Sequence, residues 1–151
     1  MQNLSDWNII NIEYMGIIVL ETSFHYMEKS MNKRDYKPRL IDRKLEEYLN
    51  TFGAVCVEGP KWCGKTWSSS YHSNSEIMIG NPDGNFQNRQ LAEMSPALVL
   101  EGESPRLIDE WQEVPPLWDA VRYKVDQSGE KGQFILTGSA TRTTKAYCIV
   151  E

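Results

Sequence analysis

The sequence contains few cysteines, no excess of positive charge and no long apolar run. Three cysteines occur among 151 residues, Cys56, Cys63 and Cys148, and their odd number and scattered spacing suit neither a disulfide framework nor a paired metal site. The simplest expectation is therefore a reduced, cytoplasmic setting. The formal net charge of −5 gives no general reason to expect that this chain binds nucleic acid by itself.

The segment that most resembles a membrane or targeting element runs from Ile9 to Leu20. It contains Glu13, is too short to span a bilayer and has no lysine or arginine before it, so neither a transmembrane helix nor a signal peptide is expected. The segment predicts either an extra strand or a translated leader ahead of a start at Met27 or Met31. We favour the leader, and we assign residues 1–30 to a leader or extra N-terminal segment.

The remaining composition is that of one folded domain. Hydrophobic residues make up 40% of the chain, with five Trp and seven Tyr, which is typical of a globular protein rather than a disordered one. A length of 151 residues is enough to bury a core. Seven basic residues lie between Glu28 and Lys44, and we interpret them as a solvated surface. They are Lys29, Lys33, Arg34, Lys37, Arg39, Arg43 and Lys44.

The most informative stretch is GPKWCGKT at residues 59–66, which fits the phosphate-loop pattern G-x-x-x-x-G-K-[ST]. The apolar run at 54–57 predicts a buried strand before it, and residues 66–70 predict a helix whose free N–H groups face the loop. Lys65 would reach the β- and γ-phosphates of a nucleotide, and the Thr66 hydroxyl would bind Mg²⁺. The alternative is a Gly-rich turn between a strand and a helix. The predicted nucleotide-binding residues of this loop are Gly59, Pro60, Lys61, Trp62, Cys63, Gly64, Lys65 and Thr66.

Two adjacent carboxylates, Asp109 and Glu110, follow the apolar pair Leu107 and Ile108. An aspartate at the end of such a strand can hold Mg²⁺ through its water shell, and a neighbouring glutamate can orient or deprotonate an attacking water. An ordinary acidic strand end is the alternative, but the position downstream of a phosphate loop favours the catalytic interpretation. The pair predicts Asp109 as a metal ligand and Glu110 as a catalytic residue beside Lys65.

A further apolar strand is predicted over residues 133–137, and it leads into hydroxyl side chains. Thr137 and Ser139 lie at its end, where a polar side chain can sense the γ-phosphate of a bound nucleotide. The alternative is that both are simple turn residues. We expect Thr137 and Ser139 to contribute to nucleotide binding.

Helices are predicted between these strands, so the chain is an α/β protein with a mainly parallel sheet. A strand is expected at 76–79, followed by a turn at 80–84 and a helix at 86–94 that Ser95-Pro96 interrupts. Another helix is expected from Pro115, ending near Gly129. The first helix is expected at Leu40–Asn50, with Gly53 as its C-cap. Its apolar stripe consists of Leu40, Ile41, Leu45, Tyr48, Leu49 and Phe52.

From about residue 36 to residue 140 the chain resembles the bacterial and archaeal AAA-superfamily ATP-binding proteins that carry a C-terminal domain of unknown function. The resemblance is carried by three stretches together, which makes it more specific than a phosphate loop alone. They are GPKWCGKT at 59–66, PRLIDEWQ at 105–112 and GQFILTGSA at 132–140.

The resemblance implies a P-loop NTPase fold of the RecA/AAA type, with helices flanking the sheet and with ATP and Mg²⁺ as ligands. It places Lys65 and Thr66 at the phosphates and metal, Asp109 on Mg²⁺, and Glu110 as the base that activates water. The strands would follow the spatial order 76–79, 106–109, 133–137, 54–57.

Members of this group continue well beyond the third stretch, and residues 141–151 do not resemble that continuation. We therefore expect a truncated member, with a partial ATPase domain at 31–140, a non-homologous tail at 141–151, and no later arginine finger or final strand. The strand at 54–57 would lie uncovered at a sheet edge, which predicts self-association.

Three functions agree with these patterns. The first is an Mg²⁺-dependent ATPase that uses Glu110. The second is a nucleotide-binding remnant without turnover, since stabilisation of transition-state charge would be incomplete. The third is an interaction fragment without a stable fold. A nucleic-acid or protein client belongs to a full-length protein and is not indicated by this acidic chain.

Overall fold

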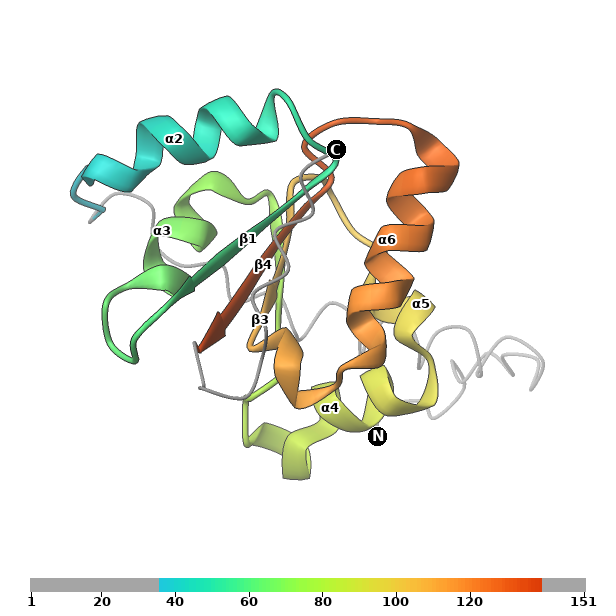
Figure 1. Ribbon diagram of the computed structural model, residues 1–151. Helices are drawn as coiled ribbons and strands as arrows, with labels where there is room; N and C mark the ends of the chain where they lie inside the picture. Colours follow the sequence, from blue (N-terminus) through green and yellow to red (C-terminus); the bar gives the residue numbers. More distant parts are fainter. Residues whose placement is uncertain (1–35, 140–151) are drawn as a thin grey trace, which may run out of the picture.

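Four parallel strands form the centre of the structure, a computed structural model that describes residues 36–139 (Figure 1). Their spatial order is β1-β4-β3-β2, which confirms the predicted order. The segments assigned to a leader and to a tail lie outside the described residues. The strands are β1 (Ala54–Gly59), β2 (Ser75–Met78), β3 (Arg106–Asp109) and β4 (Phe134–Ser139).

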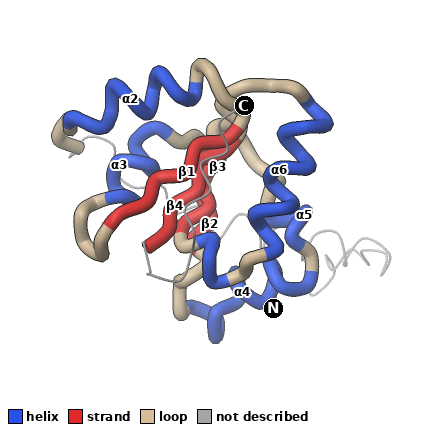
Figure 2. The backbone as a smooth tube through the Cα atoms, viewed as in Figure 1, coloured by secondary structure: helices blue, strands red, loops and turns tan. Residues whose placement is uncertain are grey.

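Helices cover both faces of this sheet, as Figures 1 and 2 show. Two helices, α2 and α3, pack together on one face, and the others lie on the opposite face and below it. No helix within the described range is long and apolar enough to cross a membrane. The helices are α2 (Leu40–Leu49), α3 (Lys65–His72), α4 (Asp83–Met94), α5 (Pro96–Val99), the 3-10 helix η2 (Trp111–Glu113) and α6 (Pro116–Ser128).

The main core lies between the sheet and helices α4, α5 and α6. Ile108 and Leu136 from the two central strands pack there with Leu117 and Val121 from α6. On β4 every residue from Phe134 to Gly138 is buried, as expected for a parallel strand that is covered on both faces. The sheet is therefore held rigidly at its centre, and its strand ends are fixed relative to one another.

Both ends of α6 agree with the sequence. The helix begins with proline in its first turn, and it ends at Gly129, whose φ of 65° is the left-handed conformation that glycine adopts readily. The predicted cap of α2 is wrong. That helix ends at Leu49 with Asn50 as its C-cap. Gly53 instead allows close packing, since a Cβ there would lie 2.3 Å from Cγ1 of Val125 on α6.

The apolar stripe predicted for α2 is only partly buried. Leu45 is buried at 2% exposure, whereas Leu40 is fully exposed and Ile41 and Tyr48 are about two-fifths exposed. The helix packs against α3 and β1 beside the edge of the sheet, so only a narrow line of its surface is covered. Helical spacing predicted that these apolar residues lie on one face of α2. How much of that face is buried depends on the position of the helix beside the sheet edge.

Two other predictions need small corrections. The strand expected at 76–79 is β2, which begins and ends one residue earlier, although the amide of Ile79 still donates to the carbonyl of Asp109 at 3.1 Å. The turn at 80–84 extends into α4, where Gly84, Asn85 and Phe86 have left-handed φ angles near 60°. Regular right-handed helix therefore begins after this turn.

Candidate functional site

The connection from β1 to α3 is the loop 60–64, which lies at the carboxyl end of the sheet. Gly64, the N-cap of α3, has φ of 90°, which a residue with a Cβ rarely adopts. Trp62 also has a positive φ, of 63°, and its side chain is 98% exposed at the tip of the loop. Lys61 and Cys63 are exposed as well. The loop thus presents backbone towards the helix start and its large side chain towards solvent.

Lys65 is the first residue of α3 and turns back into the loop. Its ammonium donates to the carbonyl oxygens of Gly59 and Pro60, both at 2.9 Å, and the residue is only 9% exposed. These two bonds use two of the three donors of a lysine. The structure therefore holds a positive charge inside the curve of the loop, beside the free N–H groups at the start of α3.

Thr66, the next residue, connects the loop to the end of β3. Its hydroxyl donates to Oδ1 of Asp109 at 2.7 Å. Thr137 on β4 donates to the same oxygen at 2.5 Å, and the strand register pairs Thr137 directly with Asp109. Three side chains that the sequence singled out therefore meet at one carboxylate oxygen. They come from helix α3 and from the neighbouring strands β4 and β3.

Glu110 lies immediately beyond Asp109 but in a different backbone conformation. Its φ of 58° is left-handed, which is uncommon for a residue with a side chain and often marks a functional position. Its amide donates to the Thr137 hydroxyl at 3.3 Å, and its carboxylate accepts a hydrogen bond from the side-chain amide of Gln112. The turn thus separates the two adjacent carboxylates and ties each to a different partner.

The two hydroxyl residues of β4 have different surroundings. Thr137 is 1% exposed and lies within the strand rather than after it, in contact with Asp109. Ser139 is the last strand residue, pairs in register with Gly59, and has a buried hydroxyl without a hydrogen-bond partner among the described residues. An unpartnered buried hydroxyl beside the start of the loop is a polar group that a ligand could satisfy.

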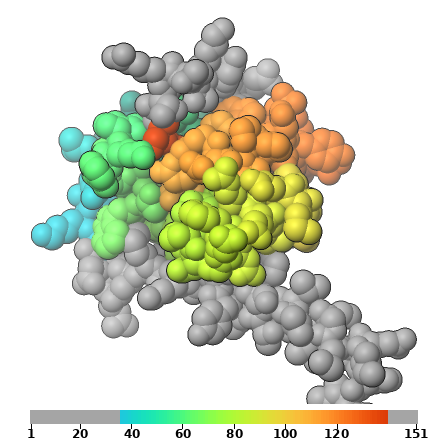
Figure 3. Space-filling model, turned by 90° about the horizontal axis from the view of Figure 1, so that it is seen from below, coloured from blue at the N-terminus to red at the C-terminus, as the bar shows by residue number. Residues whose placement is uncertain are grey.

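A space-filling view shows where this site meets the surface (Figure 3). The end of β4, in red, is visible between the green surface of the loop region and the orange surface that follows β3. The carboxyl end of β4 therefore reaches the surface in this view. Open α/β sheets place their ligands at this edge.

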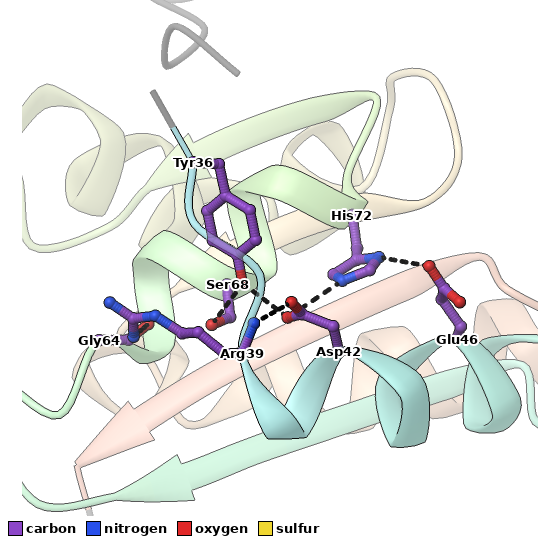
Figure 4. Close-up of polar contacts among 7 residues, drawn as sticks. All are labelled: Tyr36, Arg39, Asp42, Glu46, Gly64, Ser68 and His72. Atoms are coloured by element: carbon purple, nitrogen blue, oxygen red, sulfur yellow. Dashed lines mark hydrogen bonds and ion pairs between the residues drawn. The ribbon is translucent and has the colours of Figure 1, made fainter. Parts of the chain in front are cut away.

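Sequence reasoning missed a group of residues behind the loop, shown in Figure 4. Arg39, which we interpreted as part of a solvated basic surface, donates from Nη1 to the carbonyl oxygens of Cys63 at 3.3 Å and Gly64 at 3.2 Å. The group also includes Asp42 on α2 and His72 on α3. The Nε2 atom of His72 lies 3.3 Å from Oδ1 of Asp42.

Tyr36 completes this group. Its hydroxyl donates to Oδ1 of Asp42 at 2.6 Å, and its ring stacks on Tyr71 with centroids 4.0 Å apart. Burial is the main reason that the pKa of Tyr36 is raised, and the neighbouring Asp42 carboxylate adds to the effect. Burial acts in the same direction on Asp42, but hydrogen bonds from Tyr36, the Arg39 amide and His72 outweigh it and lower the pKa of Asp42.

The donor set limits which metal could bind. Within residues 36–139 no group of three or more His, Cys, Asp or Glu side chains is arranged to hold a metal ion by itself. Asp109 and Thr66 nevertheless offer a carboxylate and a hydroxyl at one point. Such a pair suits Mg²⁺, which binds through one or two carboxylates and takes its other ligands from water and phosphate.

Comparison with known proteins gives one match. The family model for the AAA domain matches residues 51–147, more than half of the chain, and includes the loop, Asp109 and β4. No curated protein and no solved structure matches the chain. The matched family is of the P-loop type, and a parallel sheet flanked by helices with this loop after its first strand is the fold expected of it. The chain belongs to the AAA domain family.

Proposed function

We propose that this chain binds Mg²⁺–ATP at the loop 60–64 and hydrolyses it with the carboxylates that follow β3. Membership of the AAA family supports nucleotide binding and ATPase activity in general. The observation that carries the specific proposal is the meeting of Thr66 and Thr137 at Oδ1 of Asp109. The finer resemblance, to the group with a C-terminal domain of unknown function, is part of the same proposal and rests on the three sequence stretches.

The residues of the site fit a nucleotide triphosphate. Lys65 places a mostly buried ammonium in the curve of the loop, held only by backbone carbonyls. The hydroxyl of Ser139 is buried beside the loop and lacks a partner among the described residues, so phosphate oxygens would satisfy it. The exposed N–H groups at the start of α3 favour an anion at the same place.

Each side chain then has a distinct role. Thr66 and Asp109 would hold Mg²⁺, and Thr137 would keep the Asp109 carboxylate oriented through their hydrogen bond. Bound Mg²⁺ would supply positive charge to the phosphate oxygens that become more negative during the reaction. Lys65 would add its own charge on the other side of the terminal phosphates.

Glu110 would act as the base that orients water and takes its proton. In the structure its carboxylate accepts a hydrogen bond from the Gln112 amide, so Gln112 sets the direction of that carboxylate. The same bond supports the second candidate function, a nucleotide-binding protein without turnover. A carboxylate that stays bound to Gln112 would be less available to accept a proton.

The test separates binding from hydrolysis. Calorimetry should show that Lys65→Ala greatly weakens binding of Mg²⁺–ATP, because the charge facing the phosphates is lost. Lys131→Ala removes the same charge from an exposed residue and should leave the affinity unchanged. Equal affinity of the wild type and Lys65→Ala would contradict the proposed site.

Hydrolysis is followed by phosphate release. Glu110→Gln should keep ATP binding and nearly abolish turnover, since an amide cannot accept the proton of water. Asp109→Asn should instead weaken the Mg²⁺-dependent part of binding. Wild-type chain that binds ATP but releases no phosphate would favour the binding-only function, and full turnover by Glu110→Gln would exclude Glu110 as the base.

A further inference from the structure

The Arg39 guanidinium contacts the backbone where the loop joins α3, whereas the Lys65 ammonium contacts the backbone where the loop begins. Its guanidinium donates to two successive carbonyl oxygens, those of Cys63 and Gly64, at 3.3 and 3.2 Å. A Cβ on Gly64 would lie 1.8 Å from Nη1, so the guanidinium lies directly on the loop backbone (Figure 4). The family match begins at residue 51 and therefore does not include this arginine.

The two contacts fix the orientation of two peptide planes. In a trans peptide the C=O and the following N–H point in opposite directions. The carbonyl of Cys63 shares its plane with the N–H of Gly64, and the carbonyl of Gly64 shares its plane with the N–H of Lys65. Arg39 holds both carbonyls, and the Ser68 N–H also donates to the Gly64 carbonyl at 3.1 Å, so the N–H groups of Gly64 and Lys65 point away from the guanidinium.

These two N–H groups are available to a ligand. Among the backbone hydrogen bonds of the loop in the described part of the chain, the Cys63 N–H donates to Pro60 and the Ser68 N–H donates to Gly64. Within the same residues, the N–H groups of Gly64 and Lys65 donate to no loop carbonyl. Lys65 N–H belongs to the first turn of α3, where no partner exists one turn earlier in the helix. Two oriented N–H donors beside the Lys65 ammonium suit a phosphate group.

We propose that Arg39 is a positioning residue of the phosphate site, which orients the N–H groups of Gly64 and Lys65 towards the phosphates of a bound nucleotide. This proposal rests on the function proposed above. It also links the segment before α2 to ligand binding, because any movement of that segment would release the two peptide planes.

The surroundings of Arg39 keep it in place although its side chain is exposed. Its own amide donates to Oδ2 of Asp42 at 2.6 Å, which forms a capping interaction at the start of α2. Oδ1 of Asp42 accepts the Tyr36 hydroxyl and lies 3.3 Å from His72 on α3. Stacking of Tyr36 on Tyr71 fixes the same segment to α3 from another side. The arginine is thus anchored to the very helix whose start it orients.

The test compares Arg39→Ala with Arg43→Ala in the full chain. Arg43 is an exposed arginine on α2 that forms no hydrogen bond or ion pair within the described residues, so its removal is a matched control for charge. We expect Arg39→Ala to weaken binding of Mg²⁺–ATP and of inorganic pyrophosphate by roughly 10-fold, since two charged hydrogen bonds that orient the donors are lost. Arg43→Ala should change neither affinity, and both variants should unfold at nearly the wild-type temperature.

Two further measurements distinguish positioning from a general loss of structure. Millimolar methylguanidinium should restore much of the affinity of Arg39→Ala, and Arg39→Lys, which keeps the charge without the planar group, should bind with intermediate affinity. In the nucleotide-free protein, the ¹⁵N amide signals of Gly64 and Lys65 should shift in Arg39→Ala and stay unchanged in Arg43→Ala.

The outcomes separate this inference from the proposed function. Wild-type chain that binds neither ATP nor pyrophosphate would overturn the proposed function, and the amide signals would then decide the role of Arg39 in the loop. Unchanged signals of Gly64 and Lys65 in Arg39→Ala, together with wild-type affinity, would overturn the inference. If Arg39→Ala does not fold, wild-type affinity and unshifted signals in Arg39→Lys have the same meaning.

Discussion

Thr66 and Asp109 are 43 residues apart in sequence, yet the threonine hydroxyl donates to the aspartate Oδ1 at 2.7 Å. Thr66 lies on α3, which follows β1, and Asp109 ends β3; β1 and β3 are not neighbours, because β4 lies between them. The loop after β1 therefore carries Thr66 past the end of β4 to reach Asp109. Thr137 lies on β4 and donates to the same oxygen. The position of β4 between β1 and β3 therefore brings a third side chain, that of Thr137, to the Asp109 carboxylate.

Thr137 should matter more for function than for folding. Thr137→Val keeps the shape of a buried side chain but removes the donor to Asp109 and the acceptor of the Glu110 amide. We expect a loss of about 1–2 kcal/mol in the free energy of unfolding, because the partly buried Glu110 N–H loses its partner. Mg²⁺-dependent binding of ATP should weaken further, since the Asp109 carboxylate loses its orientation.

Calorimetry at several Mg²⁺ concentrations and thermal unfolding measure the two effects separately. Thr137→Ser retains the hydroxyl and serves as the control, with binding close to that of the wild type. Wild-type Mg²⁺ dependence in Thr137→Val would show that the Thr137 bond does not position Asp109.

Gly64 should tolerate no side chain. Gly64→Ala combines an unfavourable backbone conformation, at φ of 90°, with a Cβ placed 1.8 Å from Nη1 of Arg39. The substitution should displace the guanidinium and weaken binding of Mg²⁺–ATP and pyrophosphate at least as strongly as Arg39→Ala. Calorimetry on the purified variant measures this loss.

Gly129→Ala provides the matched comparison. Gly129 also has a positive φ, of 65°, but no atom lies within 4 Å of the position of its Cβ. That variant should lose about 1 kcal/mol of stability from backbone strain alone and keep the wild-type affinity. Similar losses of affinity in both variants would indicate a general effect of destabilisation rather than a contact at the loop.

Much of this fold could be predicted, because its strands end in distinctive residues. The phosphate-loop pattern, the Asp109–Glu110 pair and the hydroxyls of β4 each follow an apolar run, and parallel strands bring such ends to one edge. Periodicity alone showed an α/β chain, and the resemblance supplied the order of the strands, which the structure confirms.

The features that could not be predicted depend on contacts between distant segments. Arg39 stands among several other basic residues, and no local pattern shows which of them reaches the loop. A glycine at position 53 suits either a helix cap or close packing of the backbone against another element. The position of Val125 on α6 shows that close packing is the reason here. Glu110, which accepts the hydrogen bond from Gln112, has a left-handed backbone conformation that glutamate does not favour, so the sequence does not predict this contact.

Asp42 should make stability depend on pH in the acid range. Its pKa in the folded protein lies below the ordinary value of 3.8: burial opposes this shift, and hydrogen bonds from Tyr36, the Arg39 amide and His72 outweigh it. A carboxyl with a lowered folded pKa stabilises the fold above its unfolded pKa. That contribution is lost as the pH falls through the folded value.

Asp42→Asn should therefore be about 1 kcal/mol less stable than the wild type at pH 7, as for loss of a helix cap, and the difference should shrink below pH 4. Urea unfolding at each pH measures this difference directly, and contributions from ionisable groups that do not contact Asp42 cancel between the two proteins. Glu47→Gln removes an exposed carboxylate from the same helix and should have little effect at any pH. A difference that stays constant from pH 7 to pH 3 would contradict the assignment to Asp42.

The outer edge of β1 should make the protein associate with itself. Within the described part of the chain, β1 is the strand at one edge of the sheet and forms a ladder with β4, and edge strands are the usual sites of pairing between protein molecules. The run Ala54–Val57 is apolar, and the first charged residue is Glu58. We therefore expect sedimentation to show a concentration-dependent increase in mass.

Hydrogen exchange locates the contact within the chain. As the protein is concentrated, the amides of β1 should exchange more slowly, because a second strand at this edge adds hydrogen bonds and excludes water. The amides of β4 provide an internal control, since that central strand is paired on both sides and should be protected at every concentration. Strong protection of all β1 amides already in the dilute monomer would show that the edge is covered, and the predicted self-association would then be wrong.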